Sequence, residues 1–301
     1  MEHVVRHHPE SIMHALLKPT GGGGVYARTA LFEEVIEGLS ALISRHREPN
    51  TEVLRFPPVM SRQMLESSGY LHSFPHLLGC VSCLDGTEIE IRTLVDKRDW
   101  TTGLTATNLV LSPAACYPIY PLQAAQGNLA AEGGLFDVAS DCFRHEATYE
   151  PGRLQSFRMR EYVFMGTAKQ AVDFRARWMP RAERIAQQLA LPYKIAPASD
   201  PFFGRAGRLV ALSQLKQSLK YELLIPVNSE EEPTACMSFN YHLDHFGSTW
   251  ALRTHDGDVA HTSCVAFGMD RLALAVFATH GIDPRKWPDT VREHLPIQST
   301  Q

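Results

Sequence analysis

The chain has 301 residues, of which 44% are hydrophobic and 21% charged, and its formal net charge is −4. This length can bury a large core, and the acidic balance disfavours a surface built to bind nucleic acid. The apolar runs are too short to span a bilayer, and the first residues contain no apolar signal segment. We therefore expect a cytoplasmic protein with no membrane partner.

The six cysteines are expected to be reduced thiols or metal ligands, because disulfides are rare in the cytoplasm. They are Cys80, Cys83, Cys116, Cys142, Cys236 and Cys264. The pair Cys80-x-x-Cys83 has no second Cys or His pair at zinc-finger spacing, so buried free thiols are expected there rather than a zinc ribbon.

The N-terminal part combines a glycine run with one clear helical pattern. Residues 1–24 end in four glycines without the Lys-Ser/Thr of a phosphate loop, so we predict a flexible segment of a single domain over 1–301. Apolar residues at helical spacing predict a helix over 30–45. Residues 51–60 are typical of a strand that Pro57-Pro58 interrupts, and such a strand lies at an edge or end of a sheet.

The segment 143–166 has the pattern of a hairpin turning at Glu150-Pro151-Gly152. Because side chains alternate along a strand, Arg153, Phe157 and Glu161 would share one face of the second strand. In the same way, Arg144 and Glu146 would share one face of the first. These charges could also form a solvated surface with cross-strand ion pairs.

The remaining elements do not alternate regularly between strand and helix. A strand and turn are predicted over 108–121, a helix over 126–132 and a long amphipathic helix over 168–191. Candidate strands follow at 223–227, 234–242, 250–255 and 264–268, and a helix over 271–280 ends at Gly281. This order predicts an α+β fold with an antiparallel sheet flanked by helices.

Three segments together resemble the signature motifs of class II aminoacyl-tRNA synthetases. They are the helix and Pro-terminated strand over 30–58, the hairpin with F-R-x-E and R-x-x-x-F-x-x-x-E, and FGMDRLALAVF, in which Arg271 follows Gly268. The resemblance implies a class II catalytic core that binds ATP with Mg²⁺. Arginines suit this chemistry because their planar guanidinium groups bind phosphate oxygens bidentately.

The resemblance also assigns roles to individual residues. Arg144 would bind the α-phosphate, Arg153 and Arg271 the distal phosphates, and Arg144 and Arg271 would be the catalytic pair. Phe157 would stack under adenine. The other implied ATP-binding residues are Glu146 on the adenine amino group, Leu154, and the segment Ala235, Cys236, Met237 and Ser238. The family has a magnesium-binding glutamate about five residues before the position of Ser238. This chain has Pro233 there, so Glu231 or Glu232 would be the substitute.

Within class II, the chain resembles seryl-tRNA synthetases of the zinc-dependent archaeal type. Residues 113–118, PAACYP, stand where other seryl enzymes carry a serine-selecting Pro-Thr-x-Glu-x-Pro-like segment. The resemblance implies a Zn²⁺ site formed by Cys116, Glu161 and Cys264, with a fourth position open for the substrate amine. Two buried thiols and a salt-bridged Glu161 are the alternative, and the rival ligands are His242, His245 and His261.

Seryl-tRNA synthetases carry a basic N-terminal arm that binds tRNA. Residues 1–29 are too short to form such an arm, so we expect that tRNA is not a partner. The combination resembles amino acid:[carrier protein] ligases, truncated homologues of the archaeal-type seryl enzymes. It implies a homodimer that activates a small amino acid, glycine or alanine, and transfers it to the phosphopantetheine thiol of a carrier protein.

Two other functions stay open: a tRNA synthetase without an arm, and an inactive paralogue with a regulatory role. The carrier could dock on the helix over 168–191, whose arginines could meet an acidic partner, or that helix could present a solvated face. The arginines are Arg175, Arg177, Arg181 and Arg184.

Overall fold

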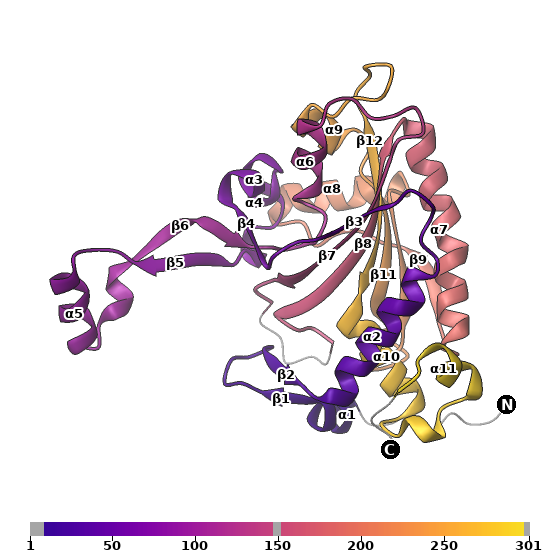
Figure 1. Ribbon diagram of the computed structural model, residues 1–301, viewed down its shortest axis with the longest axis horizontal. Helices are drawn as coiled ribbons and strands as arrows, with labels where there is room; N and C mark the ends of the chain where they lie inside the picture. The colour runs from indigo at the N-terminus through magenta and orange to yellow at the C-terminus, as the bar shows by residue number, and fades with distance from the viewer. Residues whose placement is uncertain (1–8, 147–151, 298–301) are drawn as a thin grey trace.

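The computed structural model describes residues 9–146 and 152–297. At its centre lies a seven-stranded sheet of order β3-β7-β8-β12-β11-β10-β9 (Figure 1). Neighbouring strands are antiparallel, except that β3 and β7 are parallel. The strands are β3 (Glu52–Arg55), β7 (Gly134–Phe143), β8 (Ser156–Gly166), β9 (Lys194–Pro197), β10 (Lys220–Ile225), β11 (Thr234–Tyr241) and β12 (His261–Gly268). The predicted antiparallel sheet with flanking helices is confirmed.

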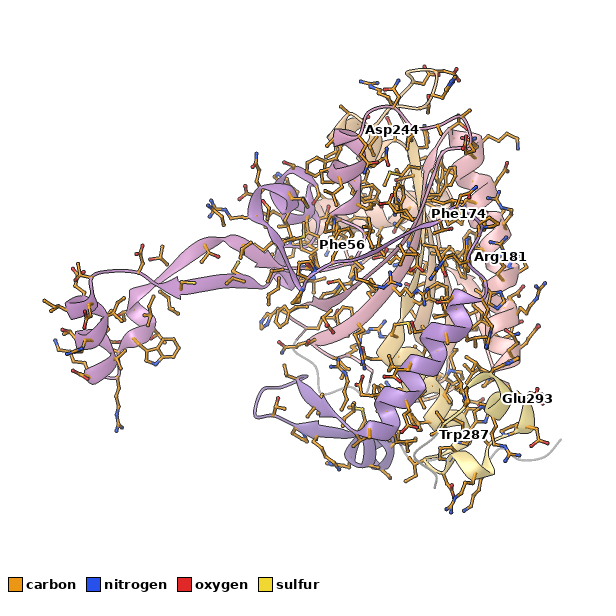
Figure 2. The ribbon with its side chains drawn as sticks, in the orientation of Figure 1. Phe56, Phe174, Arg181, Asp244, Trp287 and Glu293 are labelled. Atoms are coloured by element: carbon orange, nitrogen blue, oxygen red, sulfur yellow. The ribbon has the colours of Figure 1, made fainter. Side chains whose placement is uncertain are left out.

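Three long helices account for the packing on one face of this sheet: α2 (Ala30–Ser44), α7 (Ala168–Gln188) and α10 (Met269–His280). α7 and α10 pack on the strands and α2 packs on α10. Two α7 side chains one turn apart, Phe174 (Figure 2) and Trp178, stack on Phe164 and Tyr162 at 5.5 and 4.4 Å between ring centroids. Burial of these rings in contact stabilises the packing of α7 on the sheet.

A buried ion pair fixes α2 to the sheet. Arg160 on β8 binds Asp137 on β7 through both carboxylate oxygens, at 2.9 and 2.6 Å. The same guanidinium donates to the Ser40 carbonyl and the Ser44 hydroxyl of α2. Because the side chains of Asp137 and Arg160 are almost fully buried, each charge depends on the other.

Three other helices cover the opposite face, and these are α6 (Ile119–Ala125), α8 (Gly204–Lys216) and α9 (His245–Trp250). Three further helices are α3 (Arg62–Ser67), α4 (Tyr70–Ser73) and α11 (Asp289–His294). None of the helices in the described ranges is both long and apolar enough to cross a membrane.

The prediction of a flexible segment over 1–24 is wrong for residues 9–24. Residues Pro9–Leu16 form α1, and β1 (Leu17–Pro19) pairs with β2 (Tyr26–Arg28). Ile12, Leu16 and Leu17 are buried in the main core, so their apolar contacts fix the segment. The glycine run forms the turn of this hairpin, where Gly21 and Gly24 adopt left-handed φ values of 95° and 72°.

Two further element predictions are wrong. The helix expected over 126–132 lies earlier, at α6, where Pro118 precedes its first turn and Gly127 follows its end. Residues 250–255 are not a strand, because Ala251 takes a left-handed φ of 55° after α9 and only a single bridge, Arg253 to Val259, follows.

A narrow arm projects from the body (Figure 1). It consists of β5 (Cys80–Leu84) and β6 (Leu104–Leu111), which form a small sheet with β4 (Val59–Ser61), and of α5 (Glu88–Asp96) at the tip. Contrary to the expectation of buried thiols, Cys80 and Cys83 are exposed on this arm, whereas the other four cysteines are buried.

Candidate active site

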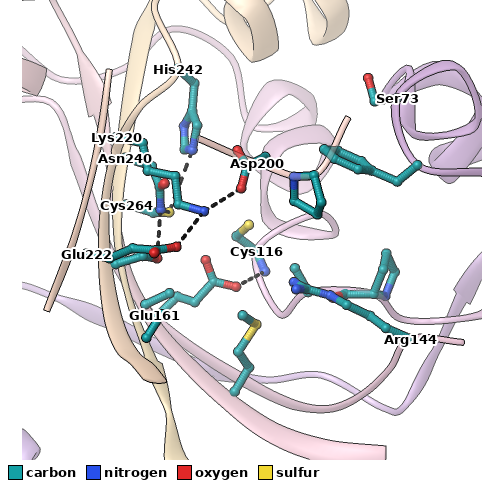
Figure 3. Close-up of a pocket in the computed structure, with 18 of the residues that line it drawn as sticks. Ser73, Cys116, Arg144, Glu161, Asp200, Lys220, Glu222, Asn240, His242 and Cys264 are labelled. Atoms are coloured by element: carbon teal, nitrogen blue, oxygen red, sulfur yellow. Dashed lines mark hydrogen bonds and ion pairs between the residues drawn. The ribbon is translucent and has the colours of Figure 1, made fainter. Parts of the chain in front are cut away.

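A cavity of about 590 Å³ (Figure 3) lies on the sheet face opposite α7, and the first turn of α10 contributes to its lining. Strands β8, β12, β11 and β10 form its floor, and the loop 113–118 and α8 contribute walls. The pairing aligns side chains across these strands: Ala266 faces Glu161, while Asn240 faces both Cys264 and Lys220. Since alternate residues share a face, Glu161, Cys264, Asn240 and Lys220 all point to the cavity side.

The cavity collects the residues that the sequence singled out. Every predicted ATP-binding or metal-binding residue except Arg153 lines it: Cys116, Arg144, Glu146, Leu154, Phe157, Glu161, Ala235, Cys236, Met237, Ser238, Cys264 and Arg271. Arg153 lies at its edge, where its guanidinium binds Glu146 at 3.3 Å. The roles of these residues stay predictions.

Arg144 and Phe157 lie together at one end of the cavity. β7 ends at Phe143, so the expectation that Arg144 and Glu146 share a face of the first strand is wrong. Arg144 instead donates to the Pro113 carbonyl at 3.0 Å, and its guanidinium lies 5.5 Å from the Phe157 ring centroid. The two expected turn residues Glu150 and Pro151 lie outside the described residues.

Arg271 occupies the first turn of α10, directly after β12, as the sequence predicted. Its guanidinium donates to the carbonyls of Gly152 and Ala235, at 2.9 and 3.0 Å. Burial lowers the pKa of Arg271, and the charges of Arg144 and Arg153 act in the same direction. Three guanidinium groups that repel one another create a site that favours a polyanion.

Asp270 is a buried acidic residue of the site that the sequence reasoning missed. Its carboxylate accepts from the Arg158 backbone N–H at 2.5 Å and also binds the guanidinium groups of Arg158 and Arg28. These contacts join β8, α10 and β2 beside Arg271. The sequence did contain a signal for this residue. Asp270 is an acidic residue directly before the motif arginine, in a helix that is otherwise apolar.

Cys116, Glu161 and Cys264 lie side by side in the cavity (Figure 3). Glu161 Oε1 accepts from the N–H groups of Ala115 and Cys116, at 2.9 and 3.0 Å, and the Cys116 and Cys264 thiols are close enough to influence the pKa of its carboxyl group. Burial raises the pKa of Glu161, and the hydrogen bond to Cys264 together with burial raises that of Cys116 well above its ordinary value.

No three or more Cys, His, Asp or Glu side chains among the described residues have the spacing of a preformed metal site. The donor chemistry of this group nevertheless fits a cation. Burial is the largest influence on the pKa of Glu161 and raises it, and the next largest come from thiols and backbone N–H groups. Two thiols and a carboxylate in contact are ligands that Zn²⁺ accepts, and the cation would offset the cost of burying the charge.

Of the rival histidines, only His242 reaches this group. Its Nε2 lies 3.6 Å from the Cys264 sulfur, and burial lowers the pKa of His242 to about 4, so the imidazole is neutral. His245 contacts the Ser68 carbonyl, and His261 pairs with the Tyr241 hydroxyl. Asn240 donates to Cys264 at 3.3 Å, a neighbour that sequence reasoning did not identify.

A second charged group lies on β10, separated from Cys264 by Asn240 of the strand between them. Lys220 Nζ binds Asp200 and Glu222 at 2.5 and 3.0 Å, and Gln214 of α8 also binds Asp200 (Figure 3). The alternation of Lys220 and Glu222 in an apolar strand could have suggested it. Glu222 also faces Ser238 across β10 and β11. The substitutes Glu231 and Glu232 do not line the cavity.

Solved structures identify the fold. Seryl-tRNA synthetase of Methanopyrus kandleri, in complex with an Aquifex aeolicus tRNA, matches with a TM-score of 0.83 over 98% of this chain and 61% of that chain, at 23% identity. Seryl-tRNA synthetase of Pyrococcus horikoshii, solved with ATP, matches with a TM-score of 0.70 over 97% and 63%, at 14% identity. The fold is therefore that of a class II aminoacyl-tRNA synthetase core.

Curated relatives identify the family, although no protein-family model matches the chain. Amino acid--[acyl-carrier-protein] ligases 1 and 2 of Bradyrhizobium diazoefficiens are 58% and 57% identical, over 97% and 95% of this chain and 90% and 87% of theirs. The type-2 serine--tRNA ligase of Methanopyrus kandleri is 25% identical, and the chain spans 57% of its length. The chain belongs to the family of amino acid--[acyl-carrier-protein] ligases.

Proposed function

We propose that the protein uses ATP to convert a small amino acid, glycine or alanine, into an aminoacyl-adenylate, and then transfers the aminoacyl group to the phosphopantetheine thiol of a carrier protein. The observation that carries this proposal is the single cavity that combines an arginine-rich end with a thiol-and-carboxylate end. The high identity to ligases named for an amino acid and an acyl-carrier protein supports it.

Adenylate formation requires control of negative charge. The amino acid carboxylate attacks the α-phosphorus of ATP, a P–O bond forms, and pyrophosphate leaves with the electron pair of the broken bond. We assign Arg144 to the α-phosphate and Arg153 and Arg271 to the distal phosphates, which Mg²⁺ accompanies. Their contribution is positioning and electrostatic stabilisation, because the nucleophile and the leaving group are both anions.

The nucleotide base would lie against Phe157, with Glu146 accepting from the adenine amino group. Backbone carbonyls fix Arg144 and Arg271 before any ligand arrives. Such fixed donors lose little entropy on binding phosphate. The carbonyl contacts also leave part of each guanidinium fork available for phosphate oxygens.

Cys116, Glu161 and Cys264 would hold Zn²⁺, which supplies Lewis acidity for binding the substrate amine. Recognition through the amine needs no substrate side chain, so it suits glycine or alanine. Tyr120 and Phe246 stack at 4.0 Å behind this group, and His242 packs edge-on against Phe246. His242 and Phe246 line the cavity here, with Tyr120 packed behind them, and this aromatic lining supports a substrate with a small side chain.

A pyrophosphate-exchange assay over glycine, alanine and serine, with and without a chelator, tests the activation step. Transfer of labelled amino acid to holo acyl carrier protein, compared with transfer to total tRNA, tests the second step. We expect exchange with glycine or alanine and labelling of the carrier alone. Labelling of tRNA would instead support a tRNA synthetase, and failure to exchange with any small amino acid would support an inactive paralogue.

A further inference from the structure

The sulfur atom of Cys264 has polar side chains from the neighbouring strand around it (Figure 3). The Asn240 amide nitrogen donates to this sulfur at 3.3 Å, and His242 Nε2 lies 3.6 Å from it. Asn240 is directly opposite Cys264 in the pairing of β11 with β12, and His242 follows the last residue of β11. The strand pairing therefore places two nitrogen atoms against one sulfur.

The amide of Asn240 is fixed by a second contact. Its nitrogen also donates to the Ser238 hydroxyl, at 3.1 Å. An amide nitrogen carries two hydrogens, so the contacts with Ser238 and Cys264 use both of them. The amide oxygen could not replace the nitrogen beside a thiolate, because both atoms would be acceptors. Asn240 is therefore a donor to Cys264.

His242 is held by two contacts with Thr262. The backbone N–H of His242 donates to the Thr262 carbonyl, and the two side chains meet at 2.9 Å between Nδ1 and Oγ1. When the Thr262 hydroxyl donates to Nδ1, the imidazole hydrogen is on Nε2, the nitrogen that faces Cys264. In the other tautomer a lone pair would face the sulfur, and a thiolate there would repel it. The Nε2–H tautomer therefore suits a charged Cys264.

A third donor lies near the other sulfur. The Tyr120 side chain is fully buried, and its hydroxyl has no hydrogen-bond partner among the residues that the structure describes. Burial raises the pKa of Tyr120 well above its ordinary value, and charge on Cys116, Cys264 and Glu161 acts in the same direction, so the hydroxyl lies near these three groups. A buried hydroxyl without an acceptor costs free energy, and a charged sulfur beside it would offset that cost.

The surroundings of these donors are apolar. Cys116, Cys264 and Tyr120 belong to one hydrophobic cluster, together with Phe246. A neutral thiol is a weak hydrogen-bond acceptor, whereas hydrogen bonds to an ionised acceptor are about twice as strong as neutral ones. Polar groups in apolar surroundings need good acceptors. The arrangement therefore fits sulfurs that carry negative charge, which is the form in which cysteine binds a metal.

We propose that Asn240, His242 and Tyr120 are positioning residues for the zinc site, a donor shell that orients the two thiolate sulfurs and withdraws part of their negative charge. This inference rests on the proposed function. Two thiolates and a carboxylate bring more negative charge than a divalent cation neutralises, and strong donation from the ligands weakens the Lewis acidity of the metal. Hydrogen bonds to the ligand atoms counter this effect, so the donor shell strengthens binding of the substrate amine.

The test uses the full chain with Co²⁺ in place of zinc, because the energy of a cobalt–thiolate charge-transfer band depends on the charge on sulfur. Tyr120→Phe removes only a hydroxyl, and His242→Phe removes the ring N–H. His242→Gln restores an N–H donor, and Tyr162→Phe, which removes a buried hydroxyl bonded to the Ile43 carbonyl, is the matched control. We expect the band to move to longer wavelength in Tyr120→Phe and His242→Phe and to keep its position in the other two variants.

Metal affinity and kinetics give independent readouts. Zinc affinity, measured by competition with a chelating indicator, should fall about tenfold or more in Tyr120→Phe and His242→Phe. In pyrophosphate exchange the KM for the amino acid should rise, with the KM for ATP kept within about twofold.

Three results would overturn the inference. They are an unchanged band and zinc affinity in both Tyr120→Phe and His242→Phe, an equal shift in Tyr162→Phe, and a band that His242→Gln fails to restore, which would make His242 a ligand rather than a donor. If the unmodified chain binds neither zinc nor cobalt, the proposed zinc site itself fails, which is a different result.

Discussion

Asp137 and Arg160 bind each other through two hydrogen bonds between neighbouring strands β7 and β8, and both side chains are almost fully buried. Because Arg160 also donates to α2, this pair connects the first-motif helix with the strand that carries Phe157 and Glu161. The pair therefore couples the position of α2 to that of the cavity floor.

Asp137→Asn should lower the free energy of unfolding by about 3–5 kcal/mol, since it leaves a buried guanidinium without its counter-charge. Urea unfolding followed by circular dichroism measures the change. Asp141→Asn, at an exposed position near the end of the same strand, is the matched control and should change stability by less than about 0.5 kcal/mol. Equal effects of the two substitutions would contradict the assignment.

Asp137 should also make stability sensitive to acid. Burial alone would raise its pKa, but hydrogen bonding and charge from Arg160, with Arg55 and Arg47, outweigh burial and hold the pKa below its ordinary value of 3.8. A depressed folded-state pKa adds stability that is complete above the unfolded-state pKa and is lost as pH falls through the folded-state value. Urea titrations below about pH 4 should show this loss, and Asp137→Asn should flatten it.

Arg271→Ala should mainly impair the use of ATP, because the guanidinium is assigned to the distal phosphates. We expect kcat/KM for ATP in pyrophosphate exchange to fall by about 10²-fold, with a much smaller effect on KM for the amino acid. Arg285→Ala, at an exposed site outside the cavity, serves as control. An unchanged dependence on ATP would count against the role of Arg271.

Cys116→Ser should remove bound zinc and abolish adenylate formation while the fold survives. Metal analysis after dialysis and pyrophosphate exchange are the two measurements. Cys142→Ser makes the same change at another buried thiol that does not line the cavity, and it should keep both zinc and activity. A fully active Cys116→Ser protein without zinc would refute the ligand assignment.

We expect a two-fold dimer formed through the first motif, α2 and the edge strand β3. Within the described residues β3 pairs on one side only, with β7, and Val53 on β3 is 42% exposed. Light scattering at working concentration should give twice the mass of the chain, and Val53→Asp should shift the population toward monomer. A monomeric unmodified chain would contradict this interface.

The sequence predicted the parts of the site that depend on local pattern. Strand alternation placed Phe157 and Glu161 on one face of β8, and the Gly268 junction placed Arg271 at the start of α10. The resemblance to class II enzymes named the residues that line the cavity. Helices with strong periodicity, α2 and α7, were predicted to within a few residues because one apolar face defines each.

The parts that the sequence missed depend on long-range contacts. The N-terminal segment is ordered because Leu16 and Leu17 pack in a hydrophobic core that is formed mainly by residues later in the chain. Lys220 is buried beside Asp200 and Glu222; the alternation of Lys220 and Glu222 is a local pattern of β10, but the approach of Asp200 from outside the strand is a long-range contact. The same Asp200 accepts a hydrogen bond from Gln214 of α8, a contact that depends on the folded chain.

The projecting arm offers a site for chemical labelling. Its two thiols, Cys80 and Cys83, are the exposed cysteines of the chain, so a maleimide dye should add there first. Residues three apart on a strand point to opposite sides, so single-cysteine variants would carry the dye on either side of the ribbon. Neither thiol lines the cavity, so a dye at either position would leave the residues around the cavity unmodified.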